Sequence, residues 1–172
     1  MKLSILNEMA DGEFCALLKD IFEHSPWVAE RVCHCRPFKS VRSLHQEMAE
    51  AVAKATSREQ MDLICAHPDL AGKAALAGEL TDASTSEQAG AGLDTLSKEE
   101  FDRFHRLNEA YKSKFGFPFI LAVKGHDKHS ILVSFENRLE NEQDDERIEA
   151  LRQISEIARF RLEAMFFEEG EQ

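Results

Sequence analysis

The 172-residue chain has little of what marks several large classes of protein. No stretch approaches the roughly 18 consecutive apolar residues of a membrane-spanning helix. Basic residues are outnumbered, with 21 lysines and arginines against 32 aspartates and glutamates, and the net charge is -11. Because such a charge repels phosphate backbones and anionic lipid, we expect no nucleic-acid partner and no membrane partner.

Cysteine is also scarce, and its placement does not suggest a disulfide framework. A chain of this length can bury a core without covalent cross-links. We therefore expect reduced thiols at all four positions, which are Cys15, Cys33, Cys35 and Cys65. Residues 1–8 carry no apolar run like that of a secretory signal, so the composition favours a soluble, cytoplasmic protein.

Helical periodicity is present along nearly the whole chain, whereas the alternation typical of strands is almost absent. Eight glycines and four prolines mark most of the segment boundaries. We predict an all-α fold, in which residues 1–172 form a single-domain irregular bundle of about seven or eight helices. The exception is the apolar run 117–123, which contains Pro118 and is expected to be a buried extended segment.

Serine residues followed by capping partners predict several helix starts. The expected N-caps are Ser40, Ser57, Ser84, Ser97 and Ser130, with Gln60, Glu87 and Glu100 completing three capping boxes. We expect Gly116 to end one helix, and Pro68 to end another at His67. The acidic stretch 140–146 is expected to be solvated and to open the last helix.

The last predicted helix places an arginine on its apolar side. At about 100° per residue, Ile154, Ala158 and Met165 surround Arg161. A buried guanidinium needs anionic or carbonyl partners. Arg161 can have a structural role, in which its side chain extends to the protein surface or caps a neighbouring helix, or it can bind a ligand. Periodicity alone favours the structural role. If its charge is unpaired, replacement by leucine should keep or raise stability.

Two further sites allow either a structural or a chemical role. His67 can cap the last carbonyls of its helix, or act as a general acid or base near neutral pH. Glu87 can complete a capping box with Ser84, which leaves Gln88 solvated, or it can face a pocket and transfer protons. The residue pattern alone favours the structural role in both cases.

Metal-binding patterns are incomplete. Cys33-His34-Cys35 and His126-Asp127-Lys128-His129 bring ligand types together, but zinc sites usually draw on two well-spaced pairs. No glycine-rich phosphate loop, Gly-x-Ser-x-Gly elbow or dinucleotide fingerprint occurs either. We expect no metal.

Longer motifs, taken in their order and spacing, resemble one family over nearly the whole chain. The strongest is Ala66-His67-Pro68-Asp69-Leu70-Ala71-Gly72-Lys73. Others are Glu87-Gln88-Ala89, Leu107-Asn108-Glu109-Ala110-Tyr111, Lys114-Phe115-Gly116-Phe117-Pro118-Phe119 and Ile157-Ala158-Arg159-Phe160-Arg161-Leu162. The set resembles the 2-oxo-4-hydroxy-4-carboxy-5-ureidoimidazoline (OHCU) decarboxylases.

The resemblance implies a carboxy-lyase that converts OHCU to (S)-allantoin during urate breakdown, without cofactor or metal. It implies His67 as the catalytic histidine and Glu87 as its partner carboxylate. Substrate binding would involve Pro68, Ser84, Gln88 and Arg161, with backbone groups of Phe119, Ile120 and Leu121. It also suggests a homodimer.

The implied substrate explains why no cofactor is expected. Its carboxylate and hydroxyl share one ring carbon, and the adjacent carbon is a ring imine that can accept the electrons released with carbon dioxide. The competing hypotheses are a non-enzymatic acidic helical interaction module and a metal-dependent helical hydrolase or redox protein that uses Cys33 and Cys35.

Overall fold

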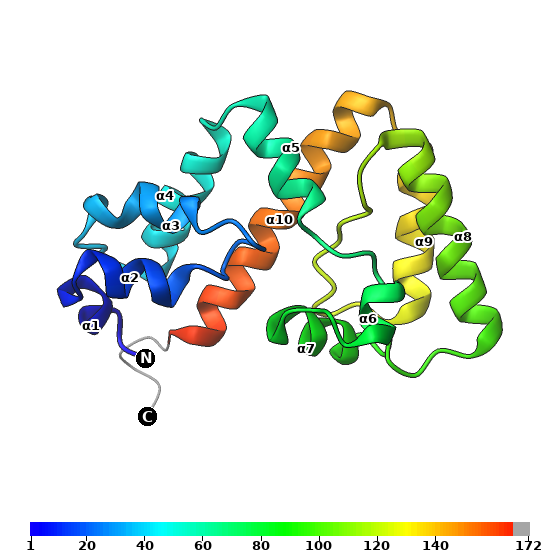
Figure 1. Cartoon of the computed structure of the whole chain (residues 1–172), viewed down its shortest axis with the longest axis horizontal. Helices are drawn as coiled ribbons and strands as arrows, with labels where there is room; N and C mark the ends of the chain where they lie inside the picture. Colours follow the sequence, from blue (N-terminus) through cyan, green and yellow to red (C-terminus); the bar gives the residue numbers. More distant parts are fainter. Residues whose placement is uncertain (167–172) are drawn as a thin grey trace. The chain divides into compact units, whose positions relative to one another are not determined.

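The structure, a computed structural model, describes residues 1–166, and within them it contains ten α-helices and no strand (Figure 1). The elements are α1 (Leu3–Glu8), α2 (Asp11–Leu18), α3 (Trp27–Val32), a 3-10 helix η1 (Cys33–Cys35), α4 (Val41–Ala53), α5 (Ser57–Cys65), α6 (Lys73–Ala77), α7 (Asp82–Gly90), α8 (Lys98–Phe115), α9 (Lys128–Arg138) and α10 (Gln143–Met165). The all-α prediction is confirmed. Two helices, α1 and α6, have only six and five residues, which explains why the sequence indicated fewer.

Contacts within the chain group it into two units. The first comprises residues 1–66 and the chain from Ser155 onward, and the second comprises His67–Ile154. The boundary near the carboxyl end falls inside α10. The prediction of one domain over residues 1–172 stays a prediction. No helix in the described range is both long and apolar enough to cross a bilayer.

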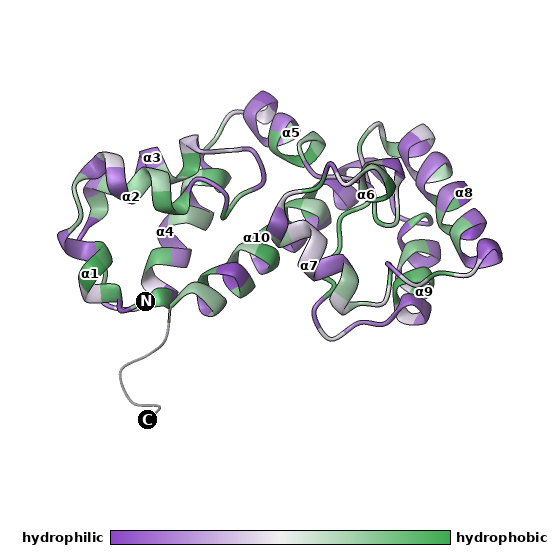
Figure 2. Cartoon of the chain, turned by 60° about the horizontal axis from the view of Figure 1, so that its bottom comes forward, coloured by the Kyte–Doolittle hydropathy of each residue, from purple (hydrophilic) through white to green (hydrophobic). Residues whose placement is uncertain are grey.

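In the first unit, α3 packs against α2 and α4. Their inner faces bury side chains at helical spacing, including Phe14, Val28, Leu44 and Met48. Figure 2 shows the resulting alternation of hydrophobic and hydrophilic residues along these helices. From α4, the His45 imidazole lies 2.9 Å from the carbonyl oxygen of Ser155, which joins α4 to the end of α10 that belongs to this unit.

The core of the second unit is aromatic. Tyr111 of α8 makes edge contacts with Phe117, Phe119 and Phe135, and the last two rings stack with their centroids 3.8 Å apart. Residues 117–123 are all buried and form neither helix nor strand. The predicted buried extended segment is therefore confirmed.

Helix caps follow the sequence only in part. Ser40 and Ser97 cap α4 and α8 as predicted, and Gly116 ends α8 with a positive φ of 78°. Three predicted caps are wrong, because a better placed residue lies just upstream: Thr56 with Glu59 replaces Ser57 with Gln60, Thr81 replaces Ser84, and Asp127 replaces Ser130. The displaced serines lie inside the first helical turn. Helix α5 ends at Cys65, two residues before His67.

Candidate functional site

His67 opens the second unit, in the loop that separates α5 from α6. Its side chain is buried, and Pro68, which follows it, is half-buried. The loop turns tightly at its far end, where Ala71 has a positive φ of 51°. A Cβ atom on Gly72 would lie 2.6 Å from the Cβ of Asp69, so only glycine fits there. The histidine therefore belongs to a constrained loop and not to a frayed helix end.

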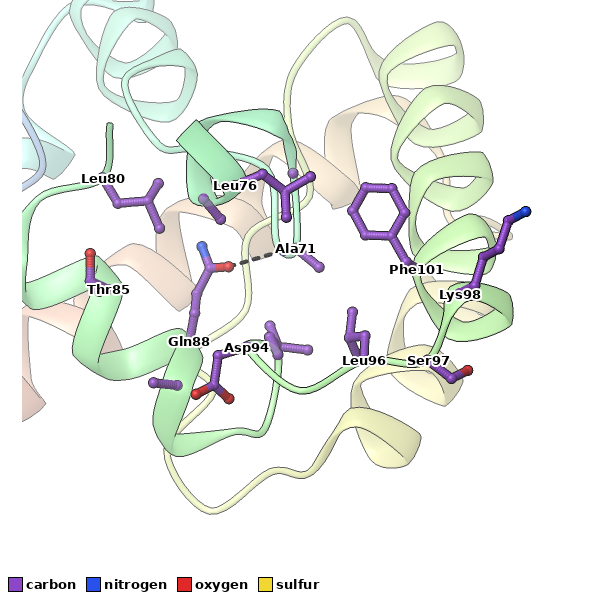
Figure 3. Close-up of a pocket in the computed structure, with 14 residues that line it drawn as sticks. Ala71, Leu76, Leu80, Thr85, Gln88, Asp94, Leu96, Ser97, Lys98 and Phe101 are labelled. Carbon is purple, nitrogen blue, oxygen red and sulfur yellow. Dashed lines mark hydrogen bonds between the residues drawn. The ribbon is translucent and has the colours of Figure 1, made fainter. Parts of the chain in front are cut away.

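Gln88 of α7 holds this loop from one side. The backbone N–H of Ala71 donates to Gln88 Oε1 over 2.9 Å (Figure 3), and Gln88 Nε2 donates to the carbonyl oxygen of Asp69 over 3.4 Å. The side chain is buried, so the expectation that it is solvated is wrong. An amide has a second lone pair and a second N–H, which leaves Gln88 capacity for another partner.

Two further polar residues of α7 that the sequence singled out lie close to Gln88 along the helix. Ser84 is one turn earlier and buried, and Glu87 is half-buried. Positions three and four apart share a helix face, so Ser84, Glu87 and Gln88 lie on one side of α7. Because Thr81 is the N-cap and its hydroxyl accepts from the Ser84 N–H over 3.3 Å, a capping box does not account for Glu87. The capping box with Ser84, which the sequence favoured as the role of Glu87, is therefore excluded.

A second set of contacts reaches the His67 loop from α8. Asn108 Nδ2 donates to the carbonyl oxygen of Leu70 over 2.9 Å, and Lys112 Nζ lies 2.7 Å from Asp69 Oδ2. Neither residue was among the predicted site residues. The signal was present for Asn108, because it lies between Phe104 and Tyr111 on the apolar face of α8, where leucine would be expected.

The backbone of residues 119–121 lies in the buried segment of the second unit. The Ile120 carbonyl oxygen accepts a hydrogen bond from Arg138, and the Ala122 N–H donates to Gln153 Oε1 over 2.8 Å. Phe119, Ile120 and Leu121 are 1%, 3% and 7% exposed. The segment is thus fixed by side chains of α9 and α10, as a backbone that contacts a ligand requires.

A buried ion pair supports this segment. Glu146 is fully buried and accepts hydrogen bonds from Arg138 and from the Tyr111 hydroxyl, while Asn141 Nδ2 donates to its second oxygen over 2.7 Å. Burial, and then the hydrogen bond to Glu146, raise the pKa of Tyr111, which keeps its hydroxyl protonated. The prediction of a solvated acidic stretch is wrong at Glu146, because this residue lies on the same inner helix face as Ala150, one turn further on.

Arg161 lies in the first unit. Its Nη1 is 2.8 Å from Glu23 Oε2 and donates to the carbonyl oxygen of Asp20 over 3.1 Å. The two charged side chains are 7% and 2% exposed. The expected anionic and carbonyl partners are therefore confirmed, but the assumption of an unpaired charge is wrong. Replacement of Arg161 by leucine would leave the buried Glu23 carboxylate without this positively charged partner.

The second unit also contains a cavity of about 590 Å³ (Figure 3). Gln88 reaches it, but His67, Ser84 and Glu87 do not line it. Its walls are mostly aliphatic or aromatic, from Ala71, Leu76, Leu80, Leu93, Leu96 and Phe101. The cavity therefore does not contain the candidate acid–base groups.

The cysteine-rich motif does not form a recognisable metal site. Cys33, His34 and Cys35 make up η1, and Cys33 Sγ contacts the Glu30 carbonyl oxygen at 3.2 Å. Among residues 1–166 no group of three or more His, Cys, Asp or Glu side chains could hold a metal ion. Burial is the main cause that raises the pKa of Cys15 and of Cys35, which favours the thiol over the nucleophilic thiolate.

The fold and these polar groups together define a class of protein: an all-helical chain with a buried histidine in a tightly held loop and a polar face on a helix that contacts that loop. Within this class, the chain belongs to the OHCU decarboxylase family, whose sequence model matches residues 7–163.

Relatives with known names support this assignment. The chain is 41% identical over 169 residues to the 2-oxo-4-hydroxy-4-carboxy-5-ureidoimidazoline decarboxylase of Haloferax volcanii, and the match covers 98% of both chains. It is 45% identical over 166 residues to the uric acid degradation bifunctional protein of Bacillus subtilis, where the match covers 96% of this chain but 33% of that protein.

Solved structures agree with the fold. An (S)-allantoin synthase superposes with a TM-score of 0.79 at 29% identity, over 97% of this chain and 54% of that one. An OHCU decarboxylase determined in the presence of (S)-allantoin gives a TM-score of 0.71 at 22% identity, over 92% and 99% of the two chains. At that identity the second comparison supports the fold alone.

Proposed function

We propose that this chain decarboxylates OHCU to (S)-allantoin in the breakdown of urate. The observation that carries the proposal is the buried His67 in a loop that Gln88 holds in place, within a chain whose family match covers residues 7–163. A histidine in a fixed loop suits proton transfer near neutral pH. Ser84 and Glu87, on the same side of α7 as Gln88, add the polar groups that an oriented substrate needs.

The reaction can be written with the electrons in the substrate alone. The bond between the ring carbon and the carboxylate breaks, and its electron pair forms a carbon–carbon double bond as the neighbouring imine nitrogen takes up a proton. The resulting enol loses its hydroxyl proton and becomes a carbonyl, while a proton is added to the adjacent carbon. Because the imine accepts the electron pair, the proposal requires neither cofactor nor metal.

The protein groups have distinct proposed roles in these steps. His67 transfers protons as the general acid or base, and Glu87 holds its tautomer or shares in the transfer. Arg161 is proposed to bind polar substrate atoms by charge-assisted hydrogen bonds. The other proposed substrate contacts come from Pro68, Ser84, Gln88 and the backbone of Phe119, Ile120 and Leu121.

The wider setting is part of the same proposal. We propose that residues 1–172 act as one catalytic domain in a cytoplasmic homodimer. The net charge of -11 supports a small-molecule substrate over nucleic acid or membrane lipid.

The test is an ultraviolet assay on freshly generated OHCU that records circular dichroism as well as absorbance. Since unaided decay gives racemic product, enzymatic turnover is recognised by accumulation of the (S) enantiomer. His67→Asn should lower turnover by about 10²–10⁴ while the helical spectrum is unchanged. A folded His67→Asn protein with full activity would remove this residue from the mechanism, and a wild-type protein that gives only racemic product would refute the proposed function.

A further inference from the structure

The loop after His67 is attached to α8 at two consecutive residues. Asn108 Nδ2 donates to the Leu70 carbonyl oxygen, and Lys112 Nζ binds the Asp69 carboxylate. Asn108 and Lys112 are four positions apart, so they lie one turn from each other on the same side of α8. We refer to these two side chains as the α8 clamp. Together they fix the chain one and two residues beyond Pro68.

Asn108 occupies a position that core packing alone would give to an apolar residue. Its side chain is 2% exposed, and the buried residues one turn away on either side are Phe104 and Tyr111. Its Oδ1 atom is buried and accepts no hydrogen bond from any described residue. A buried amide with one unmatched acceptor is unfavourable relative to leucine. Its contribution must therefore lie in the hydrogen bond to the loop.

Lys112 adds a charged contact from the next turn. The hydrogen bond to Asp69, 2.7 Å long, is the largest cause that raises the pKa of Lys112, and Glu109 Oε1 lies 3.1 Å from the same amine. Both Lys112 and Asp69 retain contact with solvent, at 37% and 24% exposure. The pair is too exposed to stabilise the fold strongly, but its geometry determines where Asp69 lies.

The loop needs such support because its conformation is strained. Ala71 has a positive φ of 51°, and Gly72 approaches the Cβ of Asp69 too closely for any other residue. Conformations of this kind persist only where the surroundings enforce them. Pro68 has a restricted φ, which removes one of the rotations that could absorb a displacement of Asp69 before it reaches His67.

We propose that Asn108 and Lys112 are positioning residues, which hold the Asp69-Leu70 backbone so that His67 keeps the orientation needed for proton transfer. Neither is proposed to touch the substrate. The inference rests on the proposed function for its kinetic consequence, but the orientation of His67 can be measured without turnover.

The kinetic test uses Asn108→Leu and Lys112→Met. Leucine matches asparagine in size and suits the surrounding core, so the fold should persist. We expect kcat to fall by about 10- to 100-fold with little change in KM, because a displaced catalytic group costs rate and not affinity. Lys112→Arg should recover most of the activity. The matched control is Lys114→Met on the same helix, because Lys114 binds the carbonyl oxygens of Leu139 and Asn141 and not the loop.

The second readout is the nitrogen NMR spectrum of the His67 imidazole, assigned by its loss in His67→Asn. Its resonances and titration should change in Asn108→Leu and Lys112→Met but not in Lys114→Met. The positioning role would be overturned if the His67 resonances are unchanged, if kcat is unchanged, or if the variants raise KM alone. If wild-type protein fails to turn over OHCU, the proposed function fails, while the imidazole spectra still decide whether the clamp orients His67.

Discussion

Two buried arginines illustrate how similar ion pairs can serve different purposes. Arg138 pairs with Glu146 in the second unit, and Arg161 pairs with Glu23 in the first; the arginine side chains are 10% and 7% exposed. Arg138 uses Nε, Nη1 and Nη2 to bind Glu146 and the Ile120 carbonyl oxygen. Arg161 Nη1 meets Glu23 and the Asp20 carbonyl oxygen.

The difference lies in what each pair holds together. Glu146 also binds Tyr111 and Asn141, so the Arg138 pair joins α8, α9 and α10 to the extended segment 117–123. These contacts account for Arg138 entirely as a structural residue. For Arg161, a substrate-binding role is proposed from the family resemblance, in addition to its contacts within the protein. Burial of an arginine therefore does not by itself separate a structural role from a catalytic one.

The largest expected effect on stability is that of Arg138→Leu. It leaves the fully buried Glu146 without its cation, which should lower the free energy of unfolding by about 3–5 kcal/mol. Urea denaturation followed by circular dichroism measures this loss. Adding Glu146→Leu should recover part of the lost stability, because no buried carboxylate is then left without its cation. If Arg138→Leu unfolds at the wild-type urea concentration, the network is not structural.

A different outcome is expected for Arg161→Leu. Its kcat/KM should fall by a factor that corresponds to about 1.5–3 kcal/mol, because a charge-assisted contact to the substrate is lost. The free energy of unfolding should fall as well, because Glu23 loses the guanidinium. Adding Glu23→Leu should recover stability but not turnover. Arg161→Lys should rescue turnover poorly, since a point charge does not reproduce the planar fork. Steady-state kinetics and melting curves decide this, and full turnover by a folded Arg161→Leu protein would contradict substrate binding.

The smallest expected effect is that of metal removal. If Arg161 supplies the positive charge that anchors the substrate, exhaustive treatment with EDTA should leave turnover within error of the untreated protein. Assays before and after chelation, with zinc added back in a third sample, measure this. Activity that disappears and returns with zinc would overturn the proposal that the reaction needs no metal.

The candidate site could be predicted from the sequence only as far as local patterns reach. Arg161 was recognisable because its apolar neighbours recur along one helix. For Gln88 the residue pattern alone favoured a solvated side chain, because its partners, Asp69 and Ala71, are nearly 20 residues away in sequence; only the family resemblance placed it at the site. The roles of Asn108 and Lys112 depend on partners about 40 residues away, which no helical periodicity can reveal.

The sequence by itself determined the all-α class, the buried segment 117–123, the Ser40 and Ser97 caps and the Gly116 stop, since each depends on neighbouring residues. It also determined membership of the family, because the family motifs are recognised by their order along the chain and not by their positions in the folded structure. Only the tertiary structure decided that Thr81 caps α7, that Glu146 is buried and that Arg161 is paired with Glu23. Two adjacent residues can compete to cap the same helix, and a charged side chain can contact either solvent or a distant partner. In both cases the outcome depends on free energies that the folded surroundings determine.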